Sequence, residues 1–244
     1  MATDADTPVV VVGGGVAGRT AAVFTARHGL DTTVVDAGGS LLRRNAHLEN
    51  VPGFPAGVNP RQFLDLLGEQ AETAGAELVT DAVTRVARDG DGFSVERADG
   101  EPLCADSVVA ATKNEVGYLR GLDGVGILDR GKIFVDTDER GRTGVDGLYA
   151  AGRLAEKPHQ AAVCAGHGAE VAVTLLEDDD RPFYHDWVAP TGYFTDRGRD
   201  LPPGCEELSE SAAGEREARS LAVTRERFAE PHPDPQETHP SLVE

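Results

Sequence analysis

The residues best suited to chemistry form a G-x-G-x-x-G motif at positions 13–18. In such a motif Gly13 allows a tight turn, Gly15 lets the backbone approach a pyrophosphate, and Gly18 lets a helix pack against a strand. Ala17 lies in the first turn of the predicted helix. Unpaired N–H groups at the start of a helix attract anions. The motif therefore predicts a site for the phosphates of a dinucleotide.

An acidic residue at the expected distance supports this prediction. Asp36 follows Gly18 by 18 residues, at the end of a second predicted strand. A carboxylate in that place accepts hydrogen bonds from ribose hydroxyls. The alternative is a glycine turn that packs a Rossmann-type unit without binding any ligand. These residues alone leave both NAD and FAD open as the dinucleotide.

The elements around the motif must position it. Residues 8–12 are a short β-branched and apolar run, which predicts a strand buried on both faces. Residues 16–28 predict a helix, and residues 32–36 predict a second strand. A strand, a glycine turn, a helix and a strand form a βαβ unit, whose two strands are parallel.

The rest of the chain continues the α/β pattern. Asn59 and Pro60 predict the start of a helix that runs to about Gly75. Further predictions are two antiparallel strands at 78–87 and 92–98, strands at 107–111, 133–135 and 147–152, and a helix at 161–176. The fold class predicted is α/β, with a central parallel sheet, a small antiparallel β-meander and an extended C-terminal tail.

Four further segments resemble one family in the order in which it carries them. Residues 47–55 are similar to an E-N-x-P-G-F loop, and residues 107–112 to a strand ending in A-T-G. Residues 131–136 and 144–152 are similar to a second flavin motif, and residues 159–161 to an R-Q-A segment. Together with the glycine motif they resemble the FAD domain of thioredoxin reductase, in the pyridine nucleotide–disulfide oxidoreductase superfamily. The resemblance covers residues 7–177 and implies FAD as the cofactor, in a Rossmann-like FAD-binding domain.

The resemblance also implies contacts to the adenosine and pyrophosphate half of FAD. Gly13 and Gly15 would face the pyrophosphate, Asp36 would hold the adenosine ribose, and the backbone of Val83 would face adenine.

For the flavin half, the resemblance implies that Leu42 and Asn50 line the pocket. Gln160 and Ala161 would offer backbone N–H groups near N1 and O2 of the ring. Negative charge gathers there when flavin is reduced, and a helix N-terminus stabilises such charge.

The resemblance also implies that a third set of residues contacts the middle of the cofactor. Ala111 and Thr112 would lie beside it, and Gly152 and Arg153 would approach its ribityl chain. Two of these segments depart from the family pattern. Lys113 stands where the A-T-G glycine is expected, and Arg153 stands where the family has an aspartate that accepts a ribityl hydrogen bond. Arginine has only donors, so it suits hydroxyl oxygens or the pyrophosphate instead.

The largest departure lies between the A-T-G strand and the second flavin motif. The family has a whole NADPH domain there, which also carries its redox C-x-x-C pair, whereas this chain has only residues 118–130. The predicted organisation is therefore an FAD-binding domain at 1–177, with a short linker at 121–131 in place of the NADPH domain. A C-terminal tail follows at 178–244, partly ordered, with a predicted helix at 209–229. The aromatic residues of segment 182–187 are either a patch that attaches this tail to the domain or a lid over the flavin.

Composition excludes several classes of function. The 23 basic and 42 acidic residues give a net charge of −19, which repels nucleic acids and anionic membranes. The acidic, lysine-poor composition resembles that of salt-adapted proteins of halophilic archaea. The three cysteines form no C-x-x-C, the histidines are too scattered for a recognisable metal site, and no secretory signal or apolar span is visible. These observations predict a cytoplasmic protein without a metal.

Three functions remain open from the sequence. The first is an FAD-dependent oxidoreductase whose flavin is reduced by an external donor, either a redox partner protein or a small molecule. The resemblance implies a homodimer. The second is a non-catalytic protein that binds FAD or another adenine nucleotide, as a sensor or remnant. The third is a small NAD-dependent enzyme, which the loop around Asn50 and the second flavin motif disfavour. No catalytic residue is recognisable.

Overall fold

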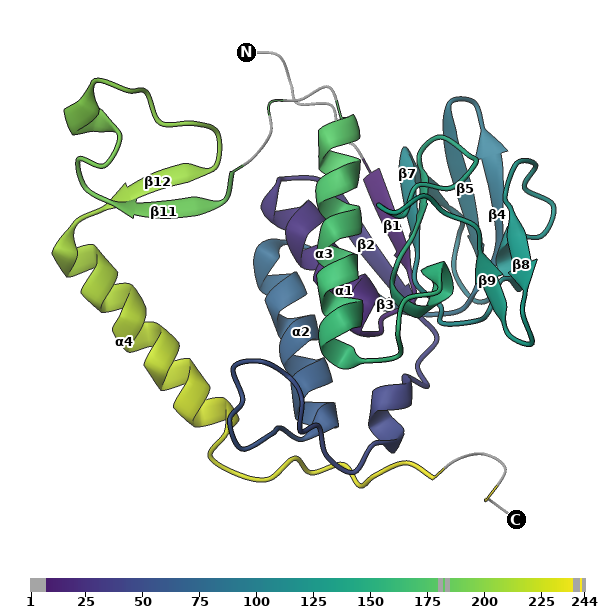
Figure 1. The fold of residues 1–244 in the computed structure, drawn as a ribbon, viewed down its shortest axis with the longest axis horizontal. Coiled ribbons are helices and arrows are strands. Elements are labelled where there is room, and N and C mark those ends of the chain that lie inside the picture. Colours follow the sequence, from purple (N-terminus) through teal and green to yellow (C-terminus); the bar gives the residue numbers. More distant parts are fainter. Residues whose placement is uncertain (1–7, 180–181, 183–184, 239–241, 243–244) are drawn as a thin grey trace. The chain divides into compact units, whose positions relative to one another are not determined.

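A computed structural model describes residues 8–179, 182, 185–238 and 242 (Figure 1). The chain forms two compact units, Met1–Asp179 with Gln236–Glu244, and Asp180–Pro235.

The first unit is built on a five-stranded parallel sheet in the order β10-β7-β1-β2-β3. Its strands are β1 (Pro8–Val12), β2 (Asp31–Asp36), β3 (Glu77–Thr80), β7 (Ser107–Ala110) and β10 (Leu148–Ala150). Three helices accompany the sheet: α1 (Val16–Arg27), α2 (Pro60–Ala74) and α3 (Ala161–Asp178). The prediction of an α/β fold with a central parallel sheet is confirmed.

The alternation of side chains along β1 divides the core into two layers. Val9 and Val11 pack with buried residues of α1 and α3, whereas Val10 and Val12 pack with Val86 and other residues of a small antiparallel sheet. Successive side chains of a strand point to opposite faces, so one β-branched run supports both layers. Figure 1 shows α1 and α3 on one face of the sheet and the small sheet on the other.

The small sheet consists of β4 (Val83–Asp89), β5 (Gly92–Arg97) and β6 (Leu103–Ala105), in that order. The prediction of a single antiparallel strand at residues 78–87 was wrong. Residues 77–80 join the parallel sheet as β3, and the chain then crosses to the small sheet as β4. The break falls at Asp81, whose carboxylate accepts hydrogen bonds from the N–H groups of Ala82 (2.7 Å) and Asp99 (3.3 Å).

The connection between the two halves of the parallel sheet is short. After β7 come the 3₁₀ turn η2 (Gly117–Leu119) and an antiparallel hairpin of β8 (Ile127–Asp129) and β9 (Ile133–Val135). The chain then reaches β10 and the 3₁₀ turn η3 (Gly152–Ala155). Another 3₁₀ turn, η1 (Leu41–Arg44), follows β2.

The second unit contains a parallel pair, β11 (Trp187–Pro190) and β12 (Cys205–Leu208), the 3₁₀ turn η4 (Thr195–Arg197) and helix α4 (Glu210–Arg227). Helix α4 falls within the range 209–229, where a helix was expected. Within this unit the ring of Trp187 packs edge-on against those of Tyr193 (4.7 Å between centroids) and Phe194 (5.5 Å). Two residues of the aromatic segment 182–187, Phe183 and Tyr184, lie outside the described residues, so the alternatives of an attaching patch and a lid stay predictions.

Candidate functional site: a cavity at the carboxyl edge of the parallel sheet

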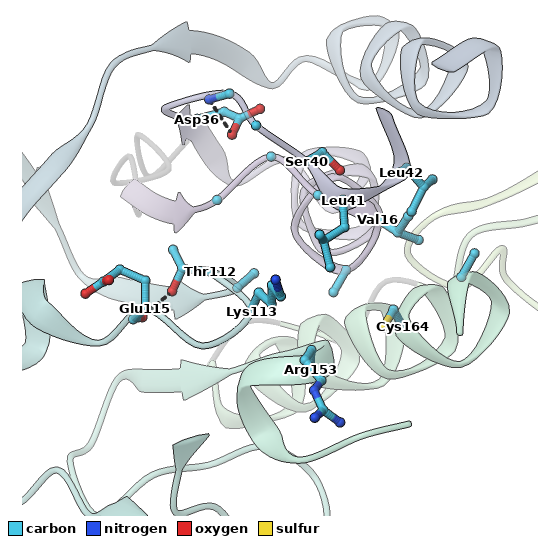
Figure 2. A pocket seen from close by; sticks show the side chains of 18 of the residues that line it. Val16, Asp36, Ser40, Leu41, Leu42, Thr112, Lys113, Glu115, Arg153 and Cys164 are labelled. Atoms are coloured by element: carbon cyan, nitrogen blue, oxygen red, sulfur yellow. Dashed lines mark hydrogen bonds between the residues drawn. The ribbon is translucent and has the colours of Figure 1, made fainter. Parts of the chain in front are cut away.

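One cavity of about 830 Å³ opens where the strands of the parallel sheet end (Figure 2). Its walls come from the turn after β1, the loop after β2, the segment after β7, the turn η3 and the start of α3. Ligands of open α/β sheets bind at this edge of the sheet. The fold therefore places the predicted motifs around a single space.

The glycine motif forms the turn between β1 and α1. Gly13 has φ +105°, and its N–H donates to the carbonyl of Val35 at 2.8 Å. A Cβ added at Gly13 would lie 2.8 Å from the carbonyl oxygen of Ala111, whereas one at Gly15 would meet nothing within 4 Å. Gly13 thus makes the turn possible, and the backbone at Gly15 is open to a ligand.

The other glycines of this region serve packing. A Cβ at Gly18 would collide with the carbonyl oxygen of Gly13, so only glycine lets α1 begin this close to the turn. A Cβ at Gly152 would lie 2.6 Å from the Cβ of Ala17. Neither Gly18 nor Gly152 lines the cavity.

Two helix N-termini reach this cavity without a capping side chain. Helix α1 begins after Gly15, helix α3 begins after Gln160, and neither cap residue accepts a hydrogen bond from the first turn through its side chain. Neither first turn contains an acidic residue. The first N–H groups of a helix have no partner within the helix and carry partial positive charge. The cavity therefore offers two places that favour negative charge on a ligand.

Asp36 ends β2 at the opposite wall. Its Oδ1 accepts a hydrogen bond from the N–H of Gly38 at 3.1 Å, and its Oδ2 lies 3.7 Å from the guanidinium of Arg19. The side chain remains 25% exposed. An ionised carboxylate has about four acceptor sites, so Asp36 retains acceptor capacity toward ligand hydroxyls.

The loop at residues 45–58 closes another side of the cavity. Asn50 donates from Nδ2 to Oε1 of Gln160 at 2.8 Å, which joins this loop to the start of α3. The loop is held by a backbone pair between Leu48 and Val58. Two segments that the sequence placed near the flavin are therefore in contact.

Five cationic or potentially cationic side chains gather at one end of the cavity: Arg44, Lys113, Lys132, Arg153 and His159. We call them the cationic cluster. All but Lys132 line the cavity. Burial lowers the pKa of Lys113, and the charges of Arg44, Lys132 and Arg153 lower it further. Burial also lowers the pKa of His159, with added effects from Arg153, Lys113 and Lys132.

Two of these residues have unusual local geometry. Lys113 has φ +65°, a left-handed conformation that costs a residue with a Cβ about 1–2 kcal/mol. The guanidinium of Arg153 lies over the ring of Phe134, with Cζ 5.0 Å from the centroid. A left-handed lysine in a cavity wall is an observed outlier of the kind found at ligand sites.

A buried hydroxyl pair supports the wall after β7. The phenol of Tyr118 and the hydroxyl of Thr112 lie 2.8 Å apart, and Thr112 also donates to the carbonyl of Glu115 at 2.6 Å. Burial raises the pKa of Tyr118, so its hydroxyl stays protonated at physiological pH. These bonds fix the position of Thr112 beside the cavity.

Burial likewise raises the pKa of the Cys164 thiol in the cavity wall. Cys104, Cys164 and Cys205 are all free thiols, and the described residues contain no group of side chains suited to a metal ion. In the same part of the chain no helix is long and apolar enough to span a membrane.

Most of the predicted site residues come together. Those lining the cavity are Gly13, Gly15, Ala17, Asp36, Leu42, Asn50, Val83, Ala111, Thr112, Arg153, Gln160 and Ala161. No signal in the sequence indicated Tyr118. Arg44 also lies in the wall, whereas Arg43 pairs with Asp65 and Glu237.

His167 supports the site from behind. Its Nδ1 accepts the N–H of Gly152 at 2.9 Å, and its Nε2 is buried without a hydrogen-bond partner in the described chain. Burial, with a smaller effect from Lys157, lowers its pKa from 6.5 to about 4. The folded protein therefore keeps His167 neutral at pH values where the unfolded chain protonates it.

This shift predicts a loss of stability in mild acid. The contribution of neutral His167 is complete above about pH 6.5 and falls as the pH approaches 4, by about 3 kcal/mol in total. Urea unfolding at pH 7 and pH 4 measures it. The variant His167→Asn, whose amide oxygen can accept from Gly152, should lose that much less stability over the same range. Equal losses in the variant and the parent would refute the assignment.

Comparison with known proteins identifies related chains. The sequence pattern of the family "Pyridine nucleotide-disulphide oxidoreductase" matches residues 7–112 and 56–168. The bifunctional thioredoxin reductase/thioredoxin of Mycobacterium leprae is 38% identical over 115 residues, which are 46% of this chain and 25% of that protein. The thioredoxin reductase of Streptomyces clavuligerus is 38% identical over 111 residues, 44% of this chain and 34% of that protein. The matched part thus spans about a quarter to a third of these relatives.

Solved structures share the fold. A thioredoxin reductase from Gloeobacter violaceus aligns with a TM-score of 0.64 at 16% identity, covering 70% of this chain and 93% of that chain. An atypical thioredoxin reductase from Desulfovibrio vulgaris aligns with a TM-score of 0.59 at 17% identity, covering 70% and 97%. The first unit therefore has the Rossmann-like fold of these structures.

Proposed function

Because the chain belongs to the pyridine nucleotide-disulphide oxidoreductase family, we propose that it is an FAD-dependent oxidoreductase that binds its cofactor in the cavity described above. Proteins of this family are FAD-binding flavoproteins. We further propose that the flavin receives electrons from an external donor, either a redox partner protein or a small molecule.

The observation that carries the proposal is the arrangement of Asp36 and two uncapped helix N-termini around one cavity. FAD has a ribose, a pyrophosphate and a ring that becomes negative on reduction, and each suits one of these features. The start of α1 would hold the pyrophosphate, Asp36 the ribose, and the start of α3 the N1 and O2 edge of the ring. A volume of about 830 Å³ fits a large organic cofactor.

When bound, FAD supplies the redox chemistry, and the residues of the chain position the cofactor and adjust its environment. The Thr112–Tyr118 pair fixes the wall after β7. The contact between Asn50 and Gln160 holds the loop against the start of α3. Arg153 remains a predicted contact to the ribityl chain or the pyrophosphate.

The proposal of an external donor rests on the connection between β7 and β9. Only η2 and the β8–β9 hairpin lie in this interval. A nicotinamide domain inserted at this point would need many more residues, so hydride from NADPH would have to come from another binding site.

A titration of the apoprotein tests the choice of cofactor. FAD should bind at least ~100-fold more tightly than FMN, equivalent to about 2.7 kcal/mol, because FMN lacks the adenosine and second phosphate that Asp36 and the glycine turn would hold. Flavin fluorescence reports both affinities. Equal affinities, or no binding of either flavin, would contradict the proposed function.

Asp36→Ala should weaken FAD binding by about 10–100-fold, because a charge-assisted hydrogen bond to the ribose is lost. Asp31→Ala is the matched control, since Asp31 begins the same strand at its other, exposed end. The same fluorescence titration measures both variants. If Asp36→Ala binds FAD like Asp31→Ala, then Asp36 is not the ribose contact.

A further inference from the structure

We propose that the cationic cluster is a second anion site, which binds a doubly charged phosphate or dicarboxylate group of a small molecule beside the flavin. The inference rests on the proposed function, because it assumes that FAD occupies the glycine-turn side of the cavity. It gives Arg153 a contact to the second anion in place of the contact to the ribityl chain or the pyrophosphate. On this proposal, the small molecule that reaches the flavin carries a phosphate or dicarboxylate group.

The members of the cluster come from separate loops that meet at one place. Lys113 follows β7, Arg153 lies in η3, Arg44 ends η1, and His159 immediately precedes the cap of α3. Lys132 lies in the β8–β9 hairpin. The fold thus brings together two of the three lysines of a chain whose net charge is −19.

Among the residues that the structure describes, these cations have no carboxylate partner. Within the described part of the chain, Arg44, Lys113 and Arg153 form no ion pair, and the charged groups that act on Lys113 are all cations. Elsewhere arginines pair with acids, as Arg142 does with Asp138 and Asp178. Acidic residues outnumber basic ones almost twofold, so an unpaired group of cations is notable. Like charges held together without compensation favour an anionic ligand.

Carboxylates that line the same cavity have other partners. Glu49 lies 2.7 Å from the ring of His47, and Glu115 accepts the N–H of Gly117 at 2.6 Å. Asp36 is near Arg19 and the N–H of Gly38. The cationic cluster therefore keeps its charge available to a ligand.

Two features prepare the cluster for binding. The guanidinium of Arg153 rests on the Phe134 ring, which restricts its motion while leaving its N–H edges free. The Nε of Arg44 is buried and has no hydrogen-bond partner in the described chain. Planar guanidinium groups bind phosphate and carboxylate through paired hydrogen bonds.

Space for a second molecule adjoins the cluster. A further cavity of about 540 Å³ shares Arg44 and His159 with the first, and its other walls include Gln236, Glu237 and Leu242. Gln236 donates from Nε2 to the carbonyl of Arg44 at 2.8 Å, so this wall is attached to η1. A small anion can therefore reach Arg44 and His159 from a side of the cluster that does not include the glycine turn.

The test is a calorimetric titration of the flavin-loaded protein with inorganic phosphate and with succinate, at an ionic strength held constant with KCl. Acetate is the singly charged control. We expect phosphate or succinate to bind at least 10-fold more tightly than acetate, and the tighter of the two identifies the charged group. A loaded protein that binds neither would overturn the proposal.

Lys113→Gly is the informative variant, because glycine adopts φ +65° without strain and the variant should fold. Lys157→Gln removes the same charge from a partly buried lysine that lines neither cavity. We expect Lys113→Gly to weaken binding of the preferred anion at least 10-fold and Lys157→Gln to leave it unchanged. Equal affinities in the two variants would overturn the proposal.

The absorbance of the flavin separates this inference from the proposed function. A protein that carries flavin but ignores both anions overturns the anion site alone. A protein that cannot bind flavin overturns the proposed function, and the inference that rests on it falls with it.

Discussion

Gly168→Val should lower the free energy of unfolding by about 3–4 kcal/mol and reduce retention of the cofactor. Gly168 lies on α3, at the point where this helix packs against the first turn of α1. A Cβ at this position would collide with the carbonyl oxygen of Ala17 and lie 3.0 Å from its Cα. Because these neighbours are backbone atoms, the two helices must move apart, and the start of α1 moves with them.

The same helix offers a matched control two residues earlier. A Cβ at Gly166 would meet nothing within 4 Å, so Gly166→Val should leave stability nearly unchanged. Urea unfolding measures both variants, and the flavin-to-protein absorbance ratio measures cofactor retention. If the two valine variants unfold alike, the contact between α1 and α3 does not determine the position of the site.

NADPH alone should reduce the flavin at least ~10³-fold more slowly than a typical turnover of about 10 s⁻¹. Hydride transfer needs the nicotinamide held about 3–3.5 Å from its acceptor. Between β7 and β9 the chain has only η2 and a hairpin, which provide no domain for that purpose.

Anaerobic stopped-flow mixing with NADPH, followed at the flavin absorbance band, measures this rate. Dithionite in a parallel experiment is the control, because this small reductant needs no binding domain. Stoichiometric bleaching by NADPH within seconds would mean that a nicotinamide site exists and that the proposal of an external donor is wrong.

The first βαβ unit and its glycine motif were predictable from local sequence. The strand expected at 8–12 is β1, and the helix expected at 16–28 differs from α1 by a single residue at its end. Glycine, β-branched and capping residues determine the backbone conformation of the residues next to them in the chain, so the sequence alone indicates their effects. The same holds for α2, where Asn59 caps the helix through hydrogen bonds to the N–H groups of Arg61 and Gln62.

Other features depend on contacts between distant residues. The break at Asp81 uses a hydrogen bond to Asp99 across the start of the small sheet, which the sequence did not predict. The bond between His167 and Gly152, and the approach of Gly168 to Ala17, exist only once α3 packs on α1. The cationic cluster likewise arises from loops that the sheet topology brings together. The periodicity and spacing of residues along the sequence do not predict contacts between such distant residues.

The most direct test of the central claim is the visible spectrum of the protein purified in the presence of FAD, before and after dithionite. We expect a yellow protein with about one flavin per chain, bleached by dithionite and restored by air. A colourless protein that cannot be reconstituted with FAD would contradict it, because the glycine turn, Asp36 and the start of α3 would then surround a cavity that does not hold the flavin.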